Sequence, residues 1–397
     1  MDLTSKLAAR TRHMGVNAIR EILKVVSEPG MISLAGGIPS PDSFPLDLMQ
    51  HLTEQVLEKY GANALQYDPT EGFGPLREAL VDHLAGHMVQ AASHEILVAS
   101  GSQGVLDALG MILISKGDTV AVESPTYIGA LQAFAPYEPR YVGLEADDEG
   151  LVLDSLEEAL RSQTVKFIYL VPTFQNPTGR TLPLDRRQGV ARLIRKYNAL
   201  LIEDDPYSAL RYRGHRLPPI KSMAPDHVVY VGTLSKVFAP GLRIGFCVAP
   251  EVLRKWLVVV KQGVDLHTAT FSQALAAEYL AQGHLDAHLP RIIKLYKPRL
   301  EAMLSALERY FPPTFKWSRP EGGMFIWARG PRGMRMTSLY RQALRERVAF
   351  VPGMYFYAHP GQGKETMRLN FSMCDETRLA LAVKTLAGVV DNSEMGA

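Results

Sequence analysis

The sequence predicts an α/β protein with a mostly parallel sheet and a smaller α+β domain at its C-terminal end. Between about residues 95 and 250, short runs rich in β-branched residues alternate with turns and amphipathic helical stretches. This alternation is typical of a parallel sheet covered by helices on both faces. The C-terminal third differs: helical periodicity from His284 to Tyr310 precedes three expected short strands, "GGMFIWA", "VAFVPG" and "TMRLNFS", and a last helix from about Glu376. We expect a three-layer αβα large domain followed by a smaller domain.

Seven short runs are expected to form the large sheet. Helical stretches such as 102–114 and 183–197 separate several of them, as crossover connections between parallel strands require. The expected strands are "EILVAS" (95–100), "TVAVES" (119–124), "RYVGLE" (140–145), "KFIYLV" (166–171), "LLIEDD" (200–205), "VVYVGT" (228–233) and "RIGFCVA" (243–249).

The domain division follows from these changes of pattern. A chain of 397 residues is long for one compact core. The N-terminal segment carries an expected helix, "VNAIREILKVV", and a Gly/Pro-rich loop, "SLAGGIPSPDSFP". We expect residues 1–45 to form an arm that joins the smaller domain, 46–289 the large domain, and 290–397 the small C-terminal domain.

Composition excludes several classes of protein. The formal net charge of +2 and the scattered basic residues do not suggest a nucleic-acid partner. Apolar runs are too short for a membrane span, and the N-terminus lacks an apolar signal core. The two cysteines, Cys247 and Cys374, make no disulfide framework and have no metal-ligand company. We expect a cytoplasmic protein without a metal site.

Polar residues cluster where the expected strands end, which is where ligands bind in such sheets. Ser102 and Gln103 follow a glycine turn and open a helix, so their backbone N–H groups could bind a phosphate. A serine cap explains the same pattern equally well. Tyr127 follows the next strand and could stack on a planar ring or simply pack.

Two further strand ends carry amide and acidic groups. Asn176 lies in "QNPTG", which is also strong turn chemistry by itself. Glu203, Asp204 and Asp205 end a strand expected to be buried, which is costly unless at least one has a cationic partner. Tyr207 is three residues beyond Asp204, close enough for both side chains to meet one ligand.

The stretch "GTLSKVFAPGLRIGF" places Lys236 among small and apolar residues, with Thr233 and Ser235 before it and Arg243 after it. Arg368 interrupts the apolar run "MRLNFS". Its planar fork suits a carboxylate, although a structural ion pair is the alternative.

Taken together, these groups describe pyridoxal phosphate. A lysine Schiff base and an acidic partner for the pyridinium nitrogen are the protein's expected contributions to that cofactor. Cationic and partly desolvated surroundings lower the pKa of a lysine, so its free amine can act as nucleophile and base. The expected partners are Ser102, Ser235 and Arg243 for the phosphate, Tyr127 for the ring, Asp204 for the ring nitrogen, Asn176 and Tyr207 for the phenolic oxygen, and Lys236 for the aldehyde.

With these residues, the chain resembles the fold-type I pyridoxal-phosphate aminotransferases of class I/II over nearly its whole length. The likeness is greatest to the branch of 2-aminoadipate (LysN-type) and kynurenine/2-aminoadipate aminotransferases. It rests on an ordered series of motifs. The series is highly specific, although no single motif would be. The motifs are "AGGIPSPDSFP", "QYDPTEG", "SGSQ", "SPTY", "QNPTG", "EDDPY", "GTLSK…GLRIG" and "RLNFS".

The resemblance implies a role for each matched residue. Lys236 would be the Schiff-base lysine, and Arg368 would bind the substrate's α-carboxylate with help from Asn176 and the backbone near Gly37. Tyr67 would reach the phosphate of the neighbouring subunit's cofactor, which implies a homodimer with sites at the interface. Ser102, Gln103, Thr233, Ser235 and Arg243 would hold the phosphate, Tyr127 would stack on the ring, Asp204 would hold the ring nitrogen, and Tyr207 with Asn176 the ring oxygen.

Arg20 is the expected reader of a distal substrate carboxylate, because it matches an arginine on the mobile N-terminal helix of the aminoadipate-type branch. The alternative is a solvated arginine at the edge of an apolar stripe that includes Ile19, Leu23 and Val26.

The resemblance implies transfer of an amino group from an L-amino acid to a 2-oxo acid, most simply 2-oxoglutarate, with ping-pong kinetics. The donors in view are 2-aminoadipate, glutamate, and aromatic or branched-chain amino acids. A lyase or decarboxylase that uses the same cofactor contacts is one alternative. The effector-binding domain of a transcription regulator is another. We do not expect it, because the first family loop already begins by Gly36 and leaves no room for a DNA-binding module.

Overall fold

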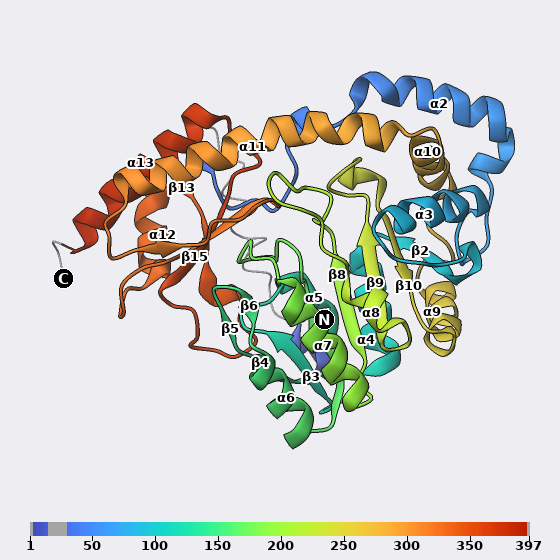
Figure 1. Cartoon of the computed structure of the whole chain (residues 1–397), viewed down its shortest axis with the longest axis horizontal. Helices are drawn as coiled ribbons and strands as arrows, with labels where there is room; N and C mark the ends of the chain where they lie inside the picture. The colour runs from blue at the N-terminus through green and yellow to red at the C-terminus, as the bar shows by residue number, and fades with distance from the viewer. Residues whose placement is uncertain (1–2, 15–29, 395–397) are drawn as a thin grey trace.

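The structure is a computed structural model that describes residues 3–14 and 30–394 (Figure 1). The expected N-terminal helix over 16–26, and Arg20 with it, lie outside the described residues. No helix in the described part of the chain is long and apolar enough to cross a membrane.

Seven strands form the central sheet, and they are the seven that the sequence predicts. Their order is β2-β10-β9-β8-β7-β3-β4, with β10 antiparallel to both neighbours and every other pair parallel. The bounds are β2 (Ile96–Ser100), β3 (Thr119–Glu123), β4 (Arg140–Leu144), β7 (Val165–Leu170), β8 (Leu201–Asp205), β9 (Val228–Thr233) and β10 (Ile244–Val248).

Helices cover both faces of this sheet, as its doubly apolar strands require. Helices α6 (Leu153–Ser162), α7 (Leu184–Lys196) and α8 (Ile220–Met223) pack on one face, against alternate strand residues such as Ile168 and Leu201. The alternate residues of the same strands, among them Phe167 and Ile202, point to the other face of the sheet and pack against a second group of helices. These are α3 (Gly74–Gly86), α4 (Ser102–Leu113), α5 (Ile128–Phe134), α9 (Glu251–Val264) and α10 (Thr270–Ala281), while α2 (Leu46–Tyr60) packs on α10. The three-layer αβα arrangement is confirmed.

The C-terminal part is a four-stranded antiparallel sheet packed with long helices. Helix α11 (His284–Tyr310) lies along α13 (Glu376–Glu394), as Figure 1 shows, and α12 (Met336–Arg345) packs against α13. The sheet order is β11-β12-β15-β14. Its strands are β11 (Lys316–Trp317), β12 (Phe325–Arg329), β14 (Val351–Pro352) and β15 (Thr366–Asn370).

The sequence predicts that the apolar run "VAFVPG" forms one strand. In the structure it forms two. Strand β13 (Val348–Ala349) pairs in parallel with β1 (Ile32–Ser33), while β14 pairs with β15. This pairing with β1 places residues Ile32–Ser33 beside Val348–Ala349 of the C-terminal part. A small hairpin of β5 (Ala146–Asp147) and β6 (Gly150–Leu151) completes the described strands.

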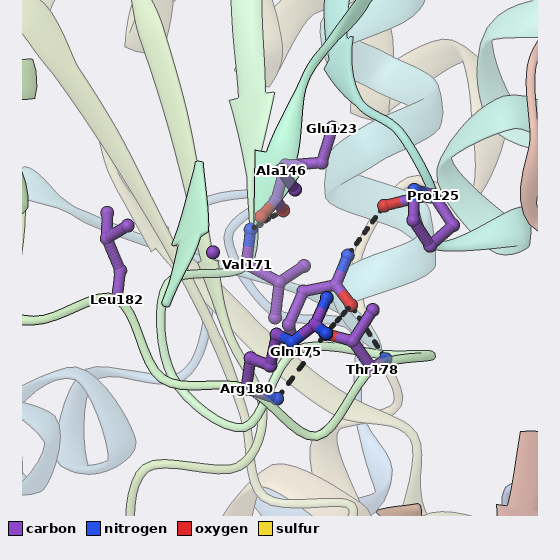
Figure 2. A pocket seen from close by; sticks show the side chains of 9 residues that line it. Glu123, Pro125, Ala146, Val171, Gln175, Thr178, Arg180 and Leu182 are labelled. Carbon is purple, nitrogen blue, oxygen red and sulfur yellow. Dashed lines mark hydrogen bonds between the residues drawn. The ribbon is translucent and has the colours of Figure 1, made fainter. Parts of the chain in front are cut away.

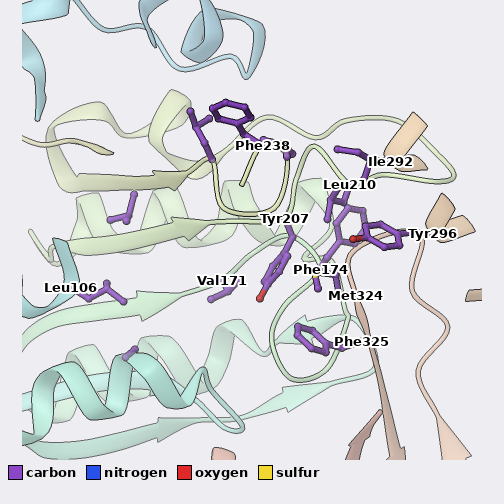
Figure 3. Packing of buried hydrophobic residues seen from close by; sticks show 14 of the residues in the cluster. Leu106, Val171, Phe174, Tyr207, Leu210, Phe238, Ile292, Tyr296, Met324 and Phe325 are labelled. Carbon is purple, nitrogen blue, oxygen red and sulfur yellow. The ribbon is translucent and has the colours of Figure 1, made fainter. Parts of the chain in front are cut away.

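One continuous apolar core joins the two parts of the molecule. Figure 3 shows Phe174, Tyr207 and Leu210, which follow central strands, beside Met324 and Phe325 from the C-terminal part. The rings of Tyr207 and Phe325 meet edge to face, with centroids 5.8 Å apart. This packing fixes the ends of β7 and β8 against β12.

Candidate active site

A cavity of about 280 Å³ lies beyond the carboxyl ends of β7, β8 and β9, between the central sheet and the C-terminal part. Its walls include every predicted site residue in the described part of the chain except Tyr67. These wall residues are Gly37, Ser102, Gln103, Tyr127, Asn176, Asp204, Tyr207, Thr233, Ser235, Lys236, Arg243 and Arg368.

Lys236 follows β9, and its Nζ donates a hydrogen bond to the carbonyl oxygen of Gly37 at 3.2 Å. Burial, together with the positive charges of Arg243 and Arg368, lowers the pKa of this amine to about 8. A lysine with this pKa has a substantial fraction of neutral amine near neutral pH, as a nucleophile or a base needs.

Asp204 is only 2% exposed at the end of β8. Its Oδ2 accepts a hydrogen bond of 2.7 Å from the hydroxyl of Tyr169, while its Oδ1 is buried and has no hydrogen-bond partner among the described residues. Burial raises the pKa of this carboxyl to about 7. A buried acceptor without a donor is costly, so Oδ1 suits a ligand N–H such as a protonated ring nitrogen.

The other two carboxylates of the "EDD" run accept hydrogen bonds from uncharged groups, and the positive charge of Arg187 also lowers the pKa of Glu203. Glu203 accepts backbone N–H bonds from Ile220 and Lys221, at 2.9 and 2.7 Å, and so caps α8. Asp205 accepts from the hydroxyl of Tyr230 at 2.7 Å. Uncharged hydrogen-bond donors therefore serve all three acids, and only Asp204 lines the cavity.

The start of α4 has the geometry expected of an anion site. Gly101 precedes it with φ of 78°, and a Cβ there would overlap the guanidinium of Arg243. A Cβ at Gly245 would overlap the backbone of Gly101 and Ser102. These two glycines let Arg243 and β10 approach the free N–H groups of the helix, which suits a phosphate.

Two hydroxyl groups lie on the same side of the cavity. The Thr233 and Ser235 hydroxyl oxygens are 2.9 Å apart, and both residues line the cavity with Arg243. Because a hydroxyl can donate, either side chain could add a hydrogen bond to a phosphate held at the helix start.

Asn176, Tyr207 and Arg368 form a connected group on another wall. Arg368 Nη1 donates to Asn176 Oδ1 at 2.9 Å, and Asn176 Nδ2 donates to the Tyr207 hydroxyl at 3.4 Å. Arg368 Nη2 donates to the carbonyl oxygen of Ala35 at 2.7 Å, and its Nε is buried with no hydrogen-bond acceptor in the part of the chain that the structure describes.

Arg368 has the charge to bind a substrate carboxylate. It is 2% exposed, forms no ion pair with another described residue, and its guanidinium lies 4.3 Å from the ring centroid of Phe325. Burial lowers its pKa to about 10. A buried cation without an acidic partner is unfavourable, so an anion of the substrate would stabilise it.

Tyr127 and Gln103 lie together at the wall between α4 and α5. Gln103 Nε2 donates to the carbonyl oxygen of Gly129 at 2.7 Å, and burial raises the pKa of the Tyr127 phenol to about 12. Tyr127 thus presents a neutral ring to the cavity, as stacking on a planar ligand needs.

Tyr67 lies outside the cavity of its own chain. Its side chain is 76% exposed, and its ring centroid is 5.6 Å from that of His267. An exposed aromatic side chain at this position is consistent with the expectation that it serves a neighbouring subunit.

Sequence reasoning missed three buried residues that support the site: Tyr169, Glu123 and Gln175. Figure 2 shows Glu123 and Gln175 around a small cavity behind the "QNPTG" loop. Gln175 Nε2 donates to the carbonyl oxygen of Pro125 at 2.9 Å, and its Oε1 accepts from the backbone and hydroxyl of Thr178. All three are interior strand or loop residues, and their spacing gave no signal of function.

The fold and the cavity define an enzyme that uses pyridoxal phosphate. Lys236 would supply the amine, Asp204 would accept a hydrogen bond from the ring nitrogen, and the start of α4 would bind the phosphate. No single residue is specific to this cofactor, but the combination around one cavity matches its functional groups.

Comparison with known proteins places the chain within a family. The sequence profile of "Aminotransferase class I and II" matches residues 29–386, so the chain belongs to the class I and II aminotransferases. It is 44% identical to aromatic-amino-acid aminotransferase 1 of Thermococcus litoralis, over 98% of this chain and 95% of the relative.

Two solved structures share the fold. Kynurenine aminotransferase of Pyrococcus horikoshii, in complex with PMP, is 42% identical with a TM-score of 0.95, covering 99% of this chain and 98% of that one. LysN, the α-aminoadipate aminotransferase of Thermus thermophilus, is 36% identical with a TM-score of 0.93, covering all of both chains. It is complexed with N-(5'-phosphopyridoxyl)-L-leucine. The cofactor of this aminotransferase is therefore pyridoxal phosphate.

Proposed function

We propose that this aminotransferase transfers the amino group of an aromatic or 2-aminoadipate-type L-amino acid to 2-oxoglutarate. Glutamate and branched-chain amino acids are further candidate donors. The observation that carries this proposal is that one cavity holds both an amine of lowered pKa, Lys236, and a buried arginine, Arg368, which forms no ion pair with a described residue. The relatives, which include aromatic-amino-acid, kynurenine and α-aminoadipate aminotransferases, support these donor classes.

Each residue then has a defined task. Arg368, held by Asn176, binds the substrate's α-carboxylate and so orients the Cα–H bond. Lys236 takes the proton from Cα of the substrate and delivers it to the aldehyde carbon of the cofactor. When bound, pyridoxal phosphate supplies the electron sink for the charge that develops at Cα. Asp204 keeps a positive charge on the ring nitrogen by accepting its hydrogen bond.

The donor and the acceptor are expected to use the same site in turn. One carboxylate-binding arginine among the described wall residues serves both substrates, since both carry an α-carboxylate. The donor's oxo acid must leave before the acceptor enters, and this predicts ping-pong kinetics.

A panel of amino donors against 2-oxoglutarate tests the proposal. The purified holoenzyme should produce glutamate with at least one aromatic, 2-aminoadipate or branched-chain donor, and initial-rate plots should give parallel lines. Lys236→Ala should lose the visible absorbance of the attached cofactor and reduce kcat by several orders of magnitude, because it removes both nucleophile and base.

The same panel distinguishes an aminotransferase from a lyase or decarboxylase. A lyase or decarboxylase would release ammonia or carbon dioxide without forming glutamate. If no donor yields glutamate, or if Lys236→Ala matches the native absorbance and turnover, the proposal is wrong.

We also propose that the active unit is a homodimer in which Tyr67 contacts the partner subunit's cofactor phosphate. The exposed position of Tyr67, outside its own cavity, supports this arrangement. A hydroxyl donor near the exposed Arg243 would complete the phosphate site from the outside.

A further inference from the structure

Tyr169 is a buried residue whose hydroxyl contacts the carboxylate of Asp204, and the strand register explains why. On β7, Tyr169 is paired with Ile202 of the parallel strand β8. Side chains alternate along a strand, so Asp204, two residues after Ile202, points to the same face of the sheet as Tyr169. The tyrosine side chain is long enough to reach the end of the neighbouring strand, where its hydroxyl lies 2.7 Å from Asp204 Oδ2.

Packing fixes the ring of Tyr169 in this position. The residue is fully buried, and its ring meets Phe134 of α5 at a centroid distance of 6.1 Å and an interplanar angle of 79°. Val122 is its neighbour on β3. A hydroxyl held this rigidly loses little conformational entropy when it donates a hydrogen bond.

We propose that Tyr169 is a positioning residue, whose hydroxyl holds Asp204 Oδ2 so that Oδ1 is left, anionic, for the cofactor's ring nitrogen. The proposal rests on the role of Asp204 proposed above. According to this proposal, one buried hydroxyl group orients the carboxylate of Asp204 and helps to keep it ionised.

The distribution of hydrogen bonds on Asp204 supports this assignment. One oxygen accepts a short bond from Tyr169, and the other is buried with no donor within residues 3–14 and 30–394. Burial raises the pKa of the carboxyl, and the negative charge of Asp205 raises it further, whereas the bond from Tyr169 lowers it. The other titratable groups whose electrostatics involve Asp204 are the phenols of Tyr127 and Tyr207. Tyr169 is therefore the donor that favours the anion.

The chain provides a closely matched control in Tyr230. This tyrosine is also buried, lies on the adjacent strand β9, and donates a 2.7 Å hydrogen bond to the neighbouring carboxylate, Asp205. It is paired with Glu203, so it points to the opposite face of the sheet from Asp204 and does not line the cavity. Tyr230→Phe deletes the same group at the same depth without touching Asp204.

The experiment compares Tyr169→Phe with Tyr230→Phe in the holoenzyme. Tyr169→Phe should weaken pyridoxal phosphate binding by roughly tenfold or more, since it removes a hydrogen bond to a charged group. The pH midpoint of the bound cofactor's visible absorbance should rise by about one unit, because a less positive ring withdraws less charge from the Lys236 nitrogen. Tyr169→Phe should also lower kcat and leave the donor KM within about twofold, because substrate binding by Arg368 is untouched.

The control variant and a double mutant separate this role from a purely structural one. Tyr230→Phe should keep the native cofactor affinity and absorbance midpoint, even if its unfolding temperature falls as much as that of Tyr169→Phe. In an Asp204→Asn background, Tyr169→Phe should cause little further loss of cofactor affinity, since both changes act through one carboxylate.

Equal cofactor affinity and absorbance midpoints in the two phenylalanine variants would overturn the proposal, as would additive losses in the double mutant. If Tyr169→Phe does not fold, Tyr169→His, which keeps a ring with an N–H donor, is compared with Tyr169→Leu, and equal affinities overturn it. These binding measurements do not depend on which donor the enzyme uses. Failure of the donor panel and failure of the Tyr169 role are therefore distinguishable.

Discussion

At the scale of single residues, the charges around the cavity limit which substrates it can bind. Three cationic side chains lie on the described walls: Lys236, Arg243 and Arg368. The first two are assigned to the cofactor, which leaves Arg368 for one carboxylate of the substrate. A donor with a second carboxylate needs a further cation, and the apolar Ile38 and Ile128 on the described wall cannot supply it.

Arg20 is the predicted source of that cation, although it lies outside the described residues. Arg20→Ala should raise the KM for glutamate and 2-aminoadipate by roughly tenfold to a hundredfold, the effect of losing a charge-assisted hydrogen bond. The KM for leucine or an aromatic donor should change little. Steady-state kinetics with both groups of donors decide the matter, and equal effects on both would show that Arg20 does not read the distal carboxylate.

Motif chemistry identified the residues that line the cavity, but not those that support them. Lys236 and Asp204 could be predicted because a lysine without charged neighbours and an acid at a strand end are unusual. Tyr169 could not, since an aromatic residue inside a strand is ordinary core, and only the register with β8 brings its hydroxyl to Asp204. The positive charge expected near the "EDD" run is that of Arg187, which lowers the pKa of Glu203, whereas backbone N–H and tyrosine hydroxyl groups donate the hydrogen bonds.

At the scale of elements, the loop of residues 171–180 is fixed to the end of β3. Glu123 Oε2 accepts from the backbone N–H of Val171 at 3.0 Å, and Gln175 links the loop to Pro125. Burial raises the pKa of Glu123 to about 8, and the Gln175 side chain opposes that shift. The small cavity between them, about 10 Å³, has room for roughly one water.

This raised pKa predicts how the stability of the apoenzyme depends on pH. The folded-state pKa lies above the ordinary value of 4.5, so the favourable contribution of Glu123 is complete below pH 4.5. It is lost as pH rises toward about 8, at up to about 1.4 kcal/mol per pH unit. Glu123→Gln stays neutral, so its free energy of unfolding should fall less between about pH 5 and 8.

Urea unfolding of both apoenzymes at the two pH values measures this difference. Glu203, which is similarly buried and has its pKa raised to about 7, contributes equally to both proteins and cancels in the comparison. A parallel fall in native protein and Glu123→Gln would contradict the prediction.

For the seven strands of the central sheet, the predicted first and last residues lie within one residue of those observed. Each strand is a short β-rich run bounded by turns. The division of the run "VAFVPG" into β13 and β14 was not predicted, because it depends on pairing with β1 and β15. Alternation along one segment cannot reveal which distant segment it pairs with. The division into residues 1–45, 46–289 and 290–397 stays a prediction.

At the scale of the whole molecule, the proposed homodimer can be tested through the location of Tyr67. If Tyr67 serves the partner's site, a Lys236→Ala chain paired with a Tyr67→Ala chain has one intact site. That site uses Lys236 of one subunit and Tyr67 of the other. The second site of the same hybrid carries both changes and is inactive.

Coexpression of the two variants with different affinity tags, followed by purification of the doubly tagged protein, isolates this hybrid. Its activity should approach half that of the native dimer, well above either parent, because each intact site works independently. A Lys236→Ala and Tyr207→Phe hybrid is the control, since both residues line the same chain's cavity. That hybrid should stay near the residual activity of Tyr207→Phe. If the Tyr67 hybrid does no better than Tyr67→Ala alone, Tyr67 acts within its own subunit or not at all.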